Sequence, residues 1–374
     1  MKWEKTTLEP LIEIKKGSYI TKKESNAGPY PVILGGQEPA YFVDKYNHTG
    51  KAIVISRSGA SAGFVSRWDE PIFVTDGFLI EAKERIDFDF LFYLLKHHQP
   101  QLQGLQDGAA IPHVNPRIIN AIEVLLPSLP IQRFIVNVLS VYDCLIDNNQ
   151  KQIKLLEEAA QRLYKEWFID LRFPGHETTP IVNGIPEGWT KTNIDSLCEL
   201  LKIAIVPDKI ESNIPYIGLE HMPRKDFCLS TWDDSSSISS NKYCFKRRNI
   251  LFGKIRPYFH KVGFAITDGV TSTDSFVIEP KQEIWGLFLL TVSSDAFVNY
   301  AYKTCKEGAK MPRADWNQMK EYSLLVANES VQKQFEKIIS EITKQIEVLA
   351  IQNHKLIEAR DRLLPKLMSG EIEV

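Results

Sequence analysis

The second half of the chain repeats the first, and this repeat limits the folds that the chain can adopt. Residues 108–113 (Gly-Ala-Ala-Ile-Pro-His) recur 200 residues later as residues 308–313 (Gly-Ala-Lys-Met-Pro-Arg). The same offset continues downstream, where Leu163 corresponds to Leu363. A tandem repeat of this length indicates two halves that are built alike.

The two copies are similar in their last third and differ in their first two thirds. A further match, Thr75-Asp76-Gly77-Phe78 with Thr273-Asp274-Ser275-Phe276, has a slightly different offset. This distribution favours a shared scaffold that carries two different specificities, and simple divergence after duplication is the alternative. The predicted organisation is a recognition domain (1–128), a scaffold helix region (129–170), a linker (171–186), a second recognition domain (187–326) and a second scaffold helix region (327–374).

Two long helices are predicted, one in each copy. The runs from Ile131 to Phe168 and from Val331 to Leu364 contain neither glycine nor proline. Their apolar residues follow each other at alternating steps of three and four residues, which is the heptad pattern of a helix with a narrow apolar seam. A helix of about 35 residues is about 50 Å long. The predicted seam consists of Ile135, Leu139, Tyr142, Ile146, Asn149, Leu156 and Leu163 in the first run and of Phe335, Ile339, Ile342, Ile346, Leu349, Asn353, Leu356 and Leu363 in the second.

The asparagines in these seams predict how the helices pair. If the helices run antiparallel about their common centre, Asn149 faces Asn353. A buried amide is costly unless a polar partner answers it, so this pair would favour one orientation and register. We therefore expect an intramolecular antiparallel coiled coil; the alternative is that each helix packs on its own domain as ordinary core.

The divergent parts are predicted to be small domains that mix strands and helices. Short apolar runs bounded by glycine and serine indicate strands, and longer periodic runs indicate helices. The expected fold class is therefore α/β (α+β), with two such domains separated by the long helices. Strands are expected at 52–55, 72–74 and 78–80 and at 250–252, 263–266 and 275–278, with helices at 88–97 and at about 282–305.

Charge is distributed unevenly, although the whole chain has a net charge of −2. That near-neutral value argues mildly against a generic DNA binder, which is usually basic. However, no acidic residue occurs between Ser235 and Thr267, where basic residues alternate with aromatic ones. Such a segment is typical of a phosphate and base-edge contact surface, although a solvated strand face would look similar. The candidate DNA contacts in this copy are Lys242, Lys246, Arg247, Arg248, Lys254, Arg256, Tyr258, His260 and Lys261.

The first copy has a sparser window of the same kind. Between Lys45 and Arg67 the chain carries no acidic residue, and the candidate contacts are Lys45, Lys51, Arg57, Ser58 and Arg67. The repeated Gly-Ala-x-x-Pro loops add His113 in one copy and Lys310 and Arg313 in the other. Turn chemistry alone would also explain the glycines of these loops.

Motifs for several other functions are absent from the sequence. We find no Gly-x-x-x-x-Gly-Lys-Ser/Thr phosphate loop and no Asn/Asp-Pro-Pro-Tyr/Phe motif. The five cysteines are scattered without a Cys-x-x-Cys pair, so neither a metal site nor a disulfide framework is indicated. The sequence shows no secretory signal and no long apolar span, so a cytoplasmic protein without a membrane partner is expected.

The pattern as a whole resembles the specificity (S) subunits of type I restriction-modification systems. The resemblance rests on the alternation of two variable and two similar regions, on residues 249–258 (Asn-Ile-Leu-Phe-Gly-Lys-Ile-Arg-Pro-Tyr) and on residues 363–372 (Leu-Leu-Pro-Lys-Leu-Met-Ser-Gly-Glu-Ile). Residues 163–168 (Leu-Tyr-Lys-Glu-Trp-Phe), which end the first copy, are also similar to the family.

The resemblance implies a non-catalytic subunit that reads a bipartite, asymmetric double-stranded DNA sequence. Each variable domain would read one half, and the coiled coil would set the spacer between the halves. Two methylation (M) subunits and the restriction (R) subunits would dock on this chain. S-adenosylmethionine, ATP and Mg²⁺ would belong to those partners, and this chain would bind no cofactor. The alternatives are a coiled-coil protein scaffold that does not bind DNA and a single-chain nuclease or modification enzyme.

Overall fold

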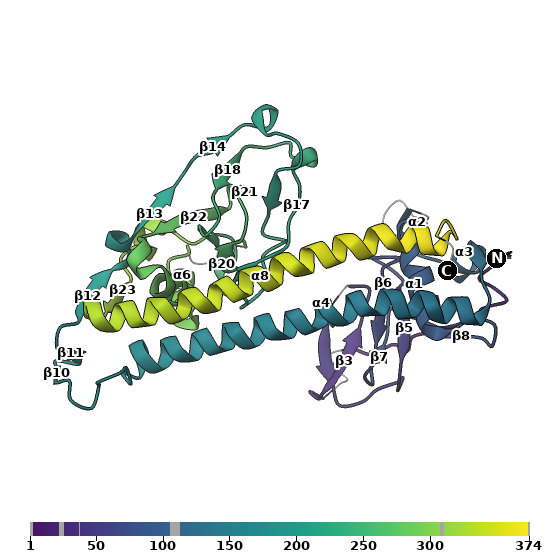
Figure 1. Ribbon diagram of the computed structural model, residues 1–374, viewed down its shortest axis with the longest axis horizontal. Coiled ribbons are helices and arrows are strands. Elements are labelled where there is room, and N and C mark those ends of the chain that lie inside the picture. The colour runs from purple at the N-terminus through teal and green to yellow at the C-terminus, as the bar shows by residue number, and fades with distance from the viewer. Residues whose placement is uncertain (1–2, 22–25, 37, 105–112, 307–309, 373–374) are drawn as a thin grey trace. The chain divides into compact units, whose positions relative to one another are not determined.

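The computed structural model describes residues 3–21, 26–36, 38–104, 113–306 and 310–372 (Figure 1). The chain forms two compact units. Unit 1 comprises residues 1–144 and 356–374, and unit 2 comprises residues 145–355. Each unit therefore takes one part of each long helix, α4 (Leu129–Tyr164) and α8 (Glu329–Met368).

Unit 1 is a mixed α and β structure with three small sheets. An antiparallel sheet has the strand order β2-β8-β5-β6, and a three-stranded sheet has the order β4-β3-β7, with β3 and β7 parallel. The third sheet pairs β1 with β9, just ahead of α4. The strands and helices are β1 (Glu4–Thr7), β2 (Ile12–Lys16), β3 (Tyr30–Ile33), β4 (Tyr41–Val43), β5 (Ala52–Ser56), β6 (Val65–Trp68), β7 (Phe73–Val74), β8 (Gly77–Ala82), α1 (Phe88–His97), α2 (Gln99–Gly104), α3 (Pro116–Asn120) and β9 (Glu123–Leu126).

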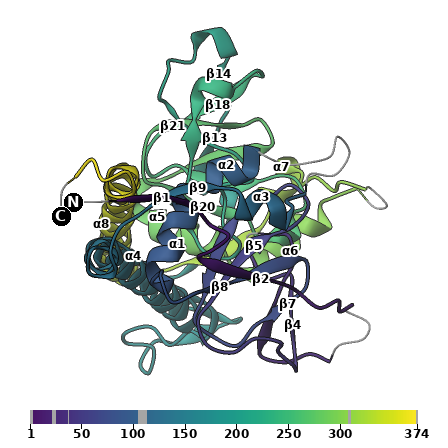
Figure 2. The same ribbon diagram turned by 90° about the vertical axis from the view of Figure 1, so that its right-hand side faces the viewer.

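Strand β5 shows why this sequence forms a central strand. All five of its residues are buried, and successive side chains of a strand point to opposite faces. Ile53 and Ile55 belong to the core that contains α1, whereas Val54 belongs to a second core with Ile72. Helix α1 lies beside β8 of the same sheet (Figure 2). The β-branched residues of this short run therefore fill both cores.

Helix α1 begins and ends where the sequence predicts. The side chain of Asp87 accepts hydrogen bonds from the backbone N–H groups of Asp89 and Phe90 and thereby caps the helix. The fully buried Gln132 of α4 accepts a hydrogen bond from the Asp87 N–H at 2.7 Å. It also donates to the carbonyl of Pro127 at 2.9 Å, so α4 and the start of α1 are joined through one amide.

Unit 2 has two five-stranded sheets, with the orders β13-β22-β19-β20-β16 and β14-β18-β21-β15-β17. Strand β12 pairs with β23, as β1 pairs with β9 in unit 1, and β10 and β11 form a hairpin. The elements are β10 (Ile181–Val182), β11 (Ile185–Pro186), β12 (Thr190–Asn193), β13 (Cys198–Leu201), β14 (Ala204–Ile205), β15 (Pro215–Ile217), β16 (Cys228–Leu229), β17 (Asp233–Asp234), β18 (Lys242–Phe245), β19 (Ile250–Gly253), β20 (Val262–Ala265), β21 (Gly269–Ser272), β22 (Ser275–Pro280), α5 (Trp285–Val292), α6 (Asp295–Lys303), α7 (Trp316–Met319) and β23 (Ser323–Val326).

Short turns of other helix types complete the chain. In the described part of unit 2 there are five 3₁₀ turns, and α4 continues into a π-helical turn. These turns are η1 (the π-helical Lys165–Ile169), η2 (Ile194–Leu197), η3 (Pro207–Lys209), η4 (Ser235–Ser237), η5 (Pro257–Phe259) and η6 (Gln282–Ile284). Phe173, in the predicted linker, is buried against Trp189, so the chain between the copies packs on unit 2.

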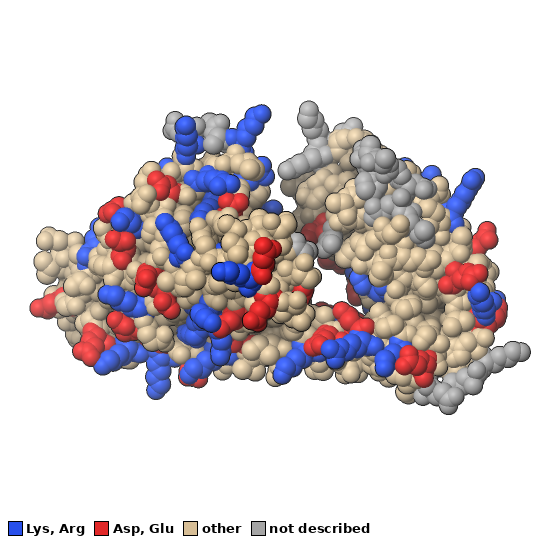
Figure 3. Space-filling model, turned by 90° about the horizontal axis from the view of Figure 1, so that it is seen from above, with Lys and Arg blue, Asp and Glu red and all other residues tan. Residues whose placement is uncertain are grey.

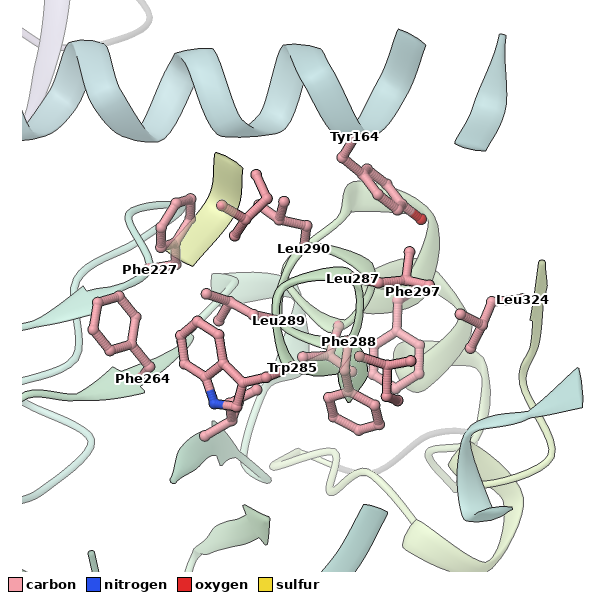
Figure 4. Close-up of a cluster of buried hydrophobic side chains, with 14 of the residues drawn as sticks. Tyr164, Phe227, Phe264, Trp285, Leu287, Phe288, Leu289, Leu290, Phe297 and Leu324 are labelled. Atoms are coloured by element: carbon pink, nitrogen blue, oxygen red, sulfur yellow. The ribbon is translucent and has the colours of Figure 1, made fainter. Parts of the chain in front are cut away.

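The single helix predicted at about 282–305 is wrong. The structure has η6 and α5, then a bend of 72° and α6. The hydroxyl of Ser294 accepts a hydrogen bond from the Phe297 N–H at 3.1 Å and so caps a new helix at this point. Every residue of α5 is buried, and Figure 4 shows its side chains between Phe227 and Phe264 on one side and Phe297 on another.

In each unit, α4 and α8 run antiparallel. In unit 2, Phe168 of η1 contacts Phe335 of α8, and Ile146 of α4 contacts Asn353 of α8. In unit 1, Asp143 binds Arg360, with 2.7 Å between Oδ1 and Nη1. The predicted seam positions are buried or half-buried in both helices. Helix α8 continues through Pro365 and ends at Met368.

The two seam asparagines lie within one turn of the predicted register but are joined differently. Asn149 and Asn353 are both 7% exposed. Within the described residues, no hydrogen bond joins the two amides. The Asn353 Nδ2 instead donates to the carbonyl oxygen of Ile146 at 3.2 Å. The Oδ1 of Asn353 is buried without a hydrogen-bond partner, so this amide is only partly satisfied.

Three glutamates of the long helices attach the rest of unit 2 to them. The Oε1 of Glu157, on α4, accepts hydrogen bonds from the N–H groups of Phe227 and Cys228 at 3.0 and 2.9 Å. Glu336, on α8, accepts two more from the first turn of α5. Glu347, also on α8, binds Arg247. Burial raises the pKa of Glu157 to about 8, with a further contribution from Asp226, and burial raises the pKa of Glu336 to about 7.

Among the described residues, one helix, at residues 129–169, is long and apolar enough by length and composition to cross a membrane. A second candidate exists only if η6 with α5 and the bent continuation α6 are counted as one span. Core helices meet the same criterion, and α5 is wholly buried inside unit 2. Length and composition are therefore weak evidence for a span.

The raised pKa of Glu157 predicts that unit 2 loses stability as the pH rises. Unfolded glutamate releases its proton near pH 4.5, whereas the folded protein holds this proton until about pH 8. The contribution of this retained proton to the free energy of unfolding is therefore complete below pH 4.5 and is lost as the pH rises through 8. Glu157→Gln keeps Oε1 as the acceptor for both N–H groups but cannot ionise. Its free energy of unfolding should exceed that of the wild type by roughly 2–4 kcal/mol at pH 8.5.

Urea denaturation at pH 5 and pH 8.5 measures this difference. Glu158→Gln, at the neighbouring and more exposed position that pairs with Arg162, is the matched control and should show no such change. A constant difference between wild type and Glu157→Gln across this pH range would contradict the prediction.

The unsatisfied amide of Asn353 predicts that an apolar residue is more stable at this position. Asn353→Leu should raise the free energy of unfolding by about 1 kcal/mol, because it removes a buried polar atom that has no partner. Asn148→Leu, at an exposed position of α4, is the control and should change stability little. A clear loss of stability in Asn353→Leu, measured by urea denaturation, would show that the bond to Ile146 outweighs the unsatisfied oxygen.

Candidate nucleic-acid interface

Three backbone segments of unit 2 meet at one loop site, which we call site 2. They are residues 254–256 after β19, residues 273–274 before β22 and residues 312–314 before α7. The Lys254 N–H donates to the Asp274 carbonyl at 2.8 Å, and the Ala314 N–H donates to the Lys254 carbonyl at 2.9 Å. A bridge between Ile255 and Arg313 completes the frame.

Unit 1 builds the same frame from the corresponding segments, and we call this site 1. The Arg57 N–H donates to the Asp76 carbonyl at 3.2 Å, and the Val114 N–H donates to the Arg57 carbonyl at 2.9 Å. Ser58 bridges to His113. Arg57, Ser58 and His113 therefore occupy the places of Lys254, Ile255 and Arg313, and each unit carries one loop site with its own side chains.

The turn after β19 presents an aromatic and basic surface at site 2. Arg256 and His260 have left-handed backbone angles, with φ of 49° and 56°, on either side of η5. Between them, Tyr258 is exposed and lies against Tyr302, with 5.4 Å between ring centroids. The guanidinium of Arg224 lies over the ring of Phe259 at 4.4 Å. Aromatic rings beside arginines suit contact with the bases and phosphates of nucleic acid.

Lys254 lies half-buried within site 2. Its ammonium donates to the Thr273 carbonyl at 2.6 Å and lies 4.6 Å from the centre of the Phe276 ring. Burial lowers the pKa of Lys254, and the nearby Asp274 carboxylate works in the opposite direction. This lysine is therefore held within the frame.

Several residues of unit 2 that the sequence predicts as DNA contacts have partners inside the protein instead. Lys242 and His260 are buried, and they bind Ser240 and the carbonyl of Ser293, respectively, so they are not available at the surface. The guanidinium of Arg248 stacks on Trp285 at 3.8 Å. The partners of His260 and Arg248 come from distant parts of the chain, and local charge could not reveal them, whereas Lys242 binds Ser240 two residues away.

The other predicted residues of unit 2 are distributed over its surface. Arg247 is bound to Glu347 of α8 at 2.6 Å, and Lys246 forms an exposed ion pair with Asp268 at 2.8 Å. Lys261 donates to the carbonyl of Leu219. The frame at site 2 thus brings together Lys254, Arg256, Tyr258 and Arg313, with Lys310 exposed on the adjoining loop.

In unit 1, the structure also separates the predicted residues. Lys51 and Arg67 both bind Asp89 in the first turn of α1, at 3.1 and 2.8 Å, so they stabilise the fold. Arg57, Ser58 and His113 lie together in site 1, whereas Lys45 is exposed on the loop after β4. The predicted loop residues 108–112 and 308–309 lie outside the described residues.

Positive and negative side chains alternate over the surface. Figure 3 shows lysines and arginines interspersed with aspartates and glutamates on the face in view. This distribution agrees with the net charge of −2. Contact with a polyanion would therefore depend on local groups such as those of the two sites. Within the described residues, no group of His, Cys, Asp and Glu is arranged to hold a metal ion.

Sequence reasoning missed four residues at these sites. Arg224 and Tyr302 lie outside the basic window but pack against its aromatic residues. Asp76 and Asp274 accept the backbone hydrogen bonds of the two frames through their carbonyls. The repeated Thr-Asp-x-Phe sequence was a signal for the aspartates, whereas no sequence signal marks Arg224 or Tyr302.

Comparisons with known proteins point to one family. Residues 1–158 match the family model described as "Type I restriction modification DNA specificity domain". The type I restriction enzyme MjaIX specificity subunit of Methanocaldococcus jannaschii is 24% identical over 349 residues, covering 87% of this chain and 78% of that protein. The putative type I specificity subunit S.MgeORF438P of Mycoplasma genitalium is 25% identical and covers 99% of this chain and 95% of its own length. A crystal structure of a type I restriction-modification S subunit from M. genitalium has a TM-score of 0.59 at 18% identity, covering 98% of this chain and 96% of that one, which shows a shared fold.

The left-handed backbone at Arg256 predicts that a suitable substitution changes DNA binding without changing the stability of the fold. Asparagine tolerates this conformation well, so Arg256→Asn should change the free energy of unfolding by less than about 1 kcal/mol. Loss of the cation should weaken retention of duplex DNA and lower the slope of log affinity against log salt by about one. Arg162→Asn, on the exposed side of α4, removes the same charge and should leave DNA retention unchanged. Equal DNA retention by wild type and Arg256→Asn would contradict the prediction.

Proposed function

We propose that this chain is a specificity subunit of a type I restriction-modification system and that it selects the DNA sequence on which such a complex acts. It is the recognition subunit and not the catalytic one. The alternative of a protein scaffold without DNA binding has no support among the relatives.

The observation that carries the proposal is the presence of one loop site in each unit, built on the same backbone frame. The frames match, but the side chains differ: Arg57 and His113 in site 1 correspond to Lys254 and Arg313 in site 2. Different side chains on equivalent frames would read different base edges. The target is therefore bipartite and asymmetric, and each unit reads one half of it.

The long helices set the spacer between the half-sites in this proposal. An antiparallel coiled coil of α4 and α8 would fix that spacing, because a helix has a constant rise per residue. The antiparallel contacts within each unit and the buried heptad positions support the coiled coil.

The catalytic groups belong to the partners of this chain. Two methylation subunits and the restriction subunits would bind it in a cytoplasmic complex without a membrane component, and S-adenosylmethionine, ATP and Mg²⁺ would bind to those partners. Exposed apolar side chains on the long helices support docking of other proteins, because such groups gain from being covered. They include Phe134, Val141, Leu155, Ile338 and Val348.

Mapping of DNA methylation tests this proposal. The chain is expressed with its methylation partners in a host that lacks the system, and methylated adenines are located by long-read sequencing. We expect one bipartite motif that is absent when this chain is omitted. Methylation without a defined motif, or the same motif in the absence of this chain, would contradict the proposal.

Exchange of residues 1–128 for those of another family member tests the division of labour. These residues contain site 1 and end just before α4. The exchange should change one half of the motif and leave the other half and the spacer unchanged. A change in both halves would show that the two units do not read independently.

A further inference from the structure

An aspartate occupies the same place in both loop sites. Asp76 and Asp274 lie in the turns before β8 and β22, within the repeated Thr-Asp-x-Phe sequence. Their backbone carbonyls accept the hydrogen bonds of the two frames, so their side-chain carboxylates can interact with other groups. Both carboxylates are largely covered, with side-chain exposures of 30% and 28%.

In site 2, the carboxylate holds an arginine from the loop before α7. The Oδ1 of Asp274 lies 3.1 Å from Nη2 of Arg313. The Arg313 side chain is 58% exposed, so the guanidinium is held on one side and open to solvent on the other. Lys254, the residue equivalent to Arg57, is turned to the carbonyl of Thr273.

In site 1, the carboxylate faces an arginine from a different part of the frame. The Oδ1 of Asp76 lies 4.0 Å from Nη1 of Arg57, at the end of β5, and Arg57 is 52% exposed. The hydroxyl of Ser58 donates to the other carboxylate oxygen and orients it. His113 stands at the position that Arg313 occupies in site 2. The aspartate is thus the constant element, and the segment that supplies its arginine differs between the sites.

We propose that Asp76 and Asp274 are positioning residues, each of which orients one arginine to read a guanine in its half of the target. This inference rests on the proposed function. Arginine recognises guanine through two parallel hydrogen bonds to O6 and N7, which requires a defined orientation of the guanidinium. A carboxylate that binds one edge of the guanidinium reduces the rotational freedom that the arginine side chain must lose on binding DNA. The opposite edge of the guanidinium stays free to bind a base.

The difference in the source of the arginine has a consequence for the target. In site 1 the arginine extends from the end of a strand, and in site 2 it extends from the loop before α7. The two guanines should therefore lie at different places within their half-sites. A carboxylate that read cytosine N4 directly would be the competing arrangement, and it would make the arginine dispensable.

The test uses the complete methylation complex and the position-by-position base preference of methylated sites. Asp274→Asn and Arg313→Lys should both relax the same G·C pair, in the half-site of unit 2, by about tenfold or more. The half-site of unit 1 should stay unchanged. Asp76→Asn and Arg57→Lys should both relax one G·C pair in the half-site of unit 1 and leave the half-site of unit 2 unchanged.

Asp195→Asn is the matched control, because Asp195 forms a comparable exposed ion pair with Lys320 in unit 2, outside the site. It should leave the motif unchanged. Arg313→Lys keeps Asp274 in place and tests the same base pair if the Asp274→Asn complex does not assemble. A merely structural role would lower methylation at all sites without relaxing one position.

Three results would overturn the inference. One is an unchanged motif in Asp274→Asn or in Arg313→Lys, another is a uniform loss of methylation, and the third is relaxation of different positions by the two variants. A wild-type complex without any motif would instead refute the proposed function. A wild-type motif that these variants leave intact would refute this inference alone.

Discussion

The rest of the structure depends on the buried seam that α4 and α8 share. Both helices contribute to both units, and the seam residues belong to the same apolar cores as the sheets and short helices. Because heptad positions recur at a fixed interval, one sequence pattern supports both cores. Polar contacts also join the two helices: Asn353 of the seam binds a backbone carbonyl in unit 2, and Asp143 beside the seam binds Arg360 in unit 1.

The two units use different chemistry to attach their strands and short helices to α4 and α8. Unit 1 uses neutral Gln132, whose amide both accepts and donates hydrogen bonds. Unit 2 uses the buried acids Glu157 and Glu336 at the corresponding interface. These carboxyl groups accept hydrogen bonds from backbone N–H groups, which lowers their pKa values. Burial outweighs this effect and raises the pKa of Glu157 to about 8 and that of Glu336 to about 7. The duplicated helices have therefore diverged in charge where they contact diverged domains.

The sequence predicted the elements whose signal is local. The positions of α1, of strands β5 and β19, and of the seams of α4 and α8 follow from short apolar runs and from periodicity. The break before α6 was missed, because the apolar residues around it continue on both sides and only the Ser294 hydroxyl marks the new helix. At the candidate interface, charge predicted the segment but not the side chains that face solvent. His260 and Arg247 have partners that only the tertiary fold brings close.

In each unit, one strand pair joins the two ends of the region that precedes a long helix: β1 pairs with β9, and β12 pairs with β23. Unit 1 enters its region through β1 and leaves it through β9, directly before α4 begins. The paired strands hold the two ends of the intervening segment together, so this segment behaves as a closed loop. The entropy cost of closing such a loop rises only slowly with its length. Insertions or deletions inside this segment therefore cost little entropy, while the start of the helix keeps its place in the chain.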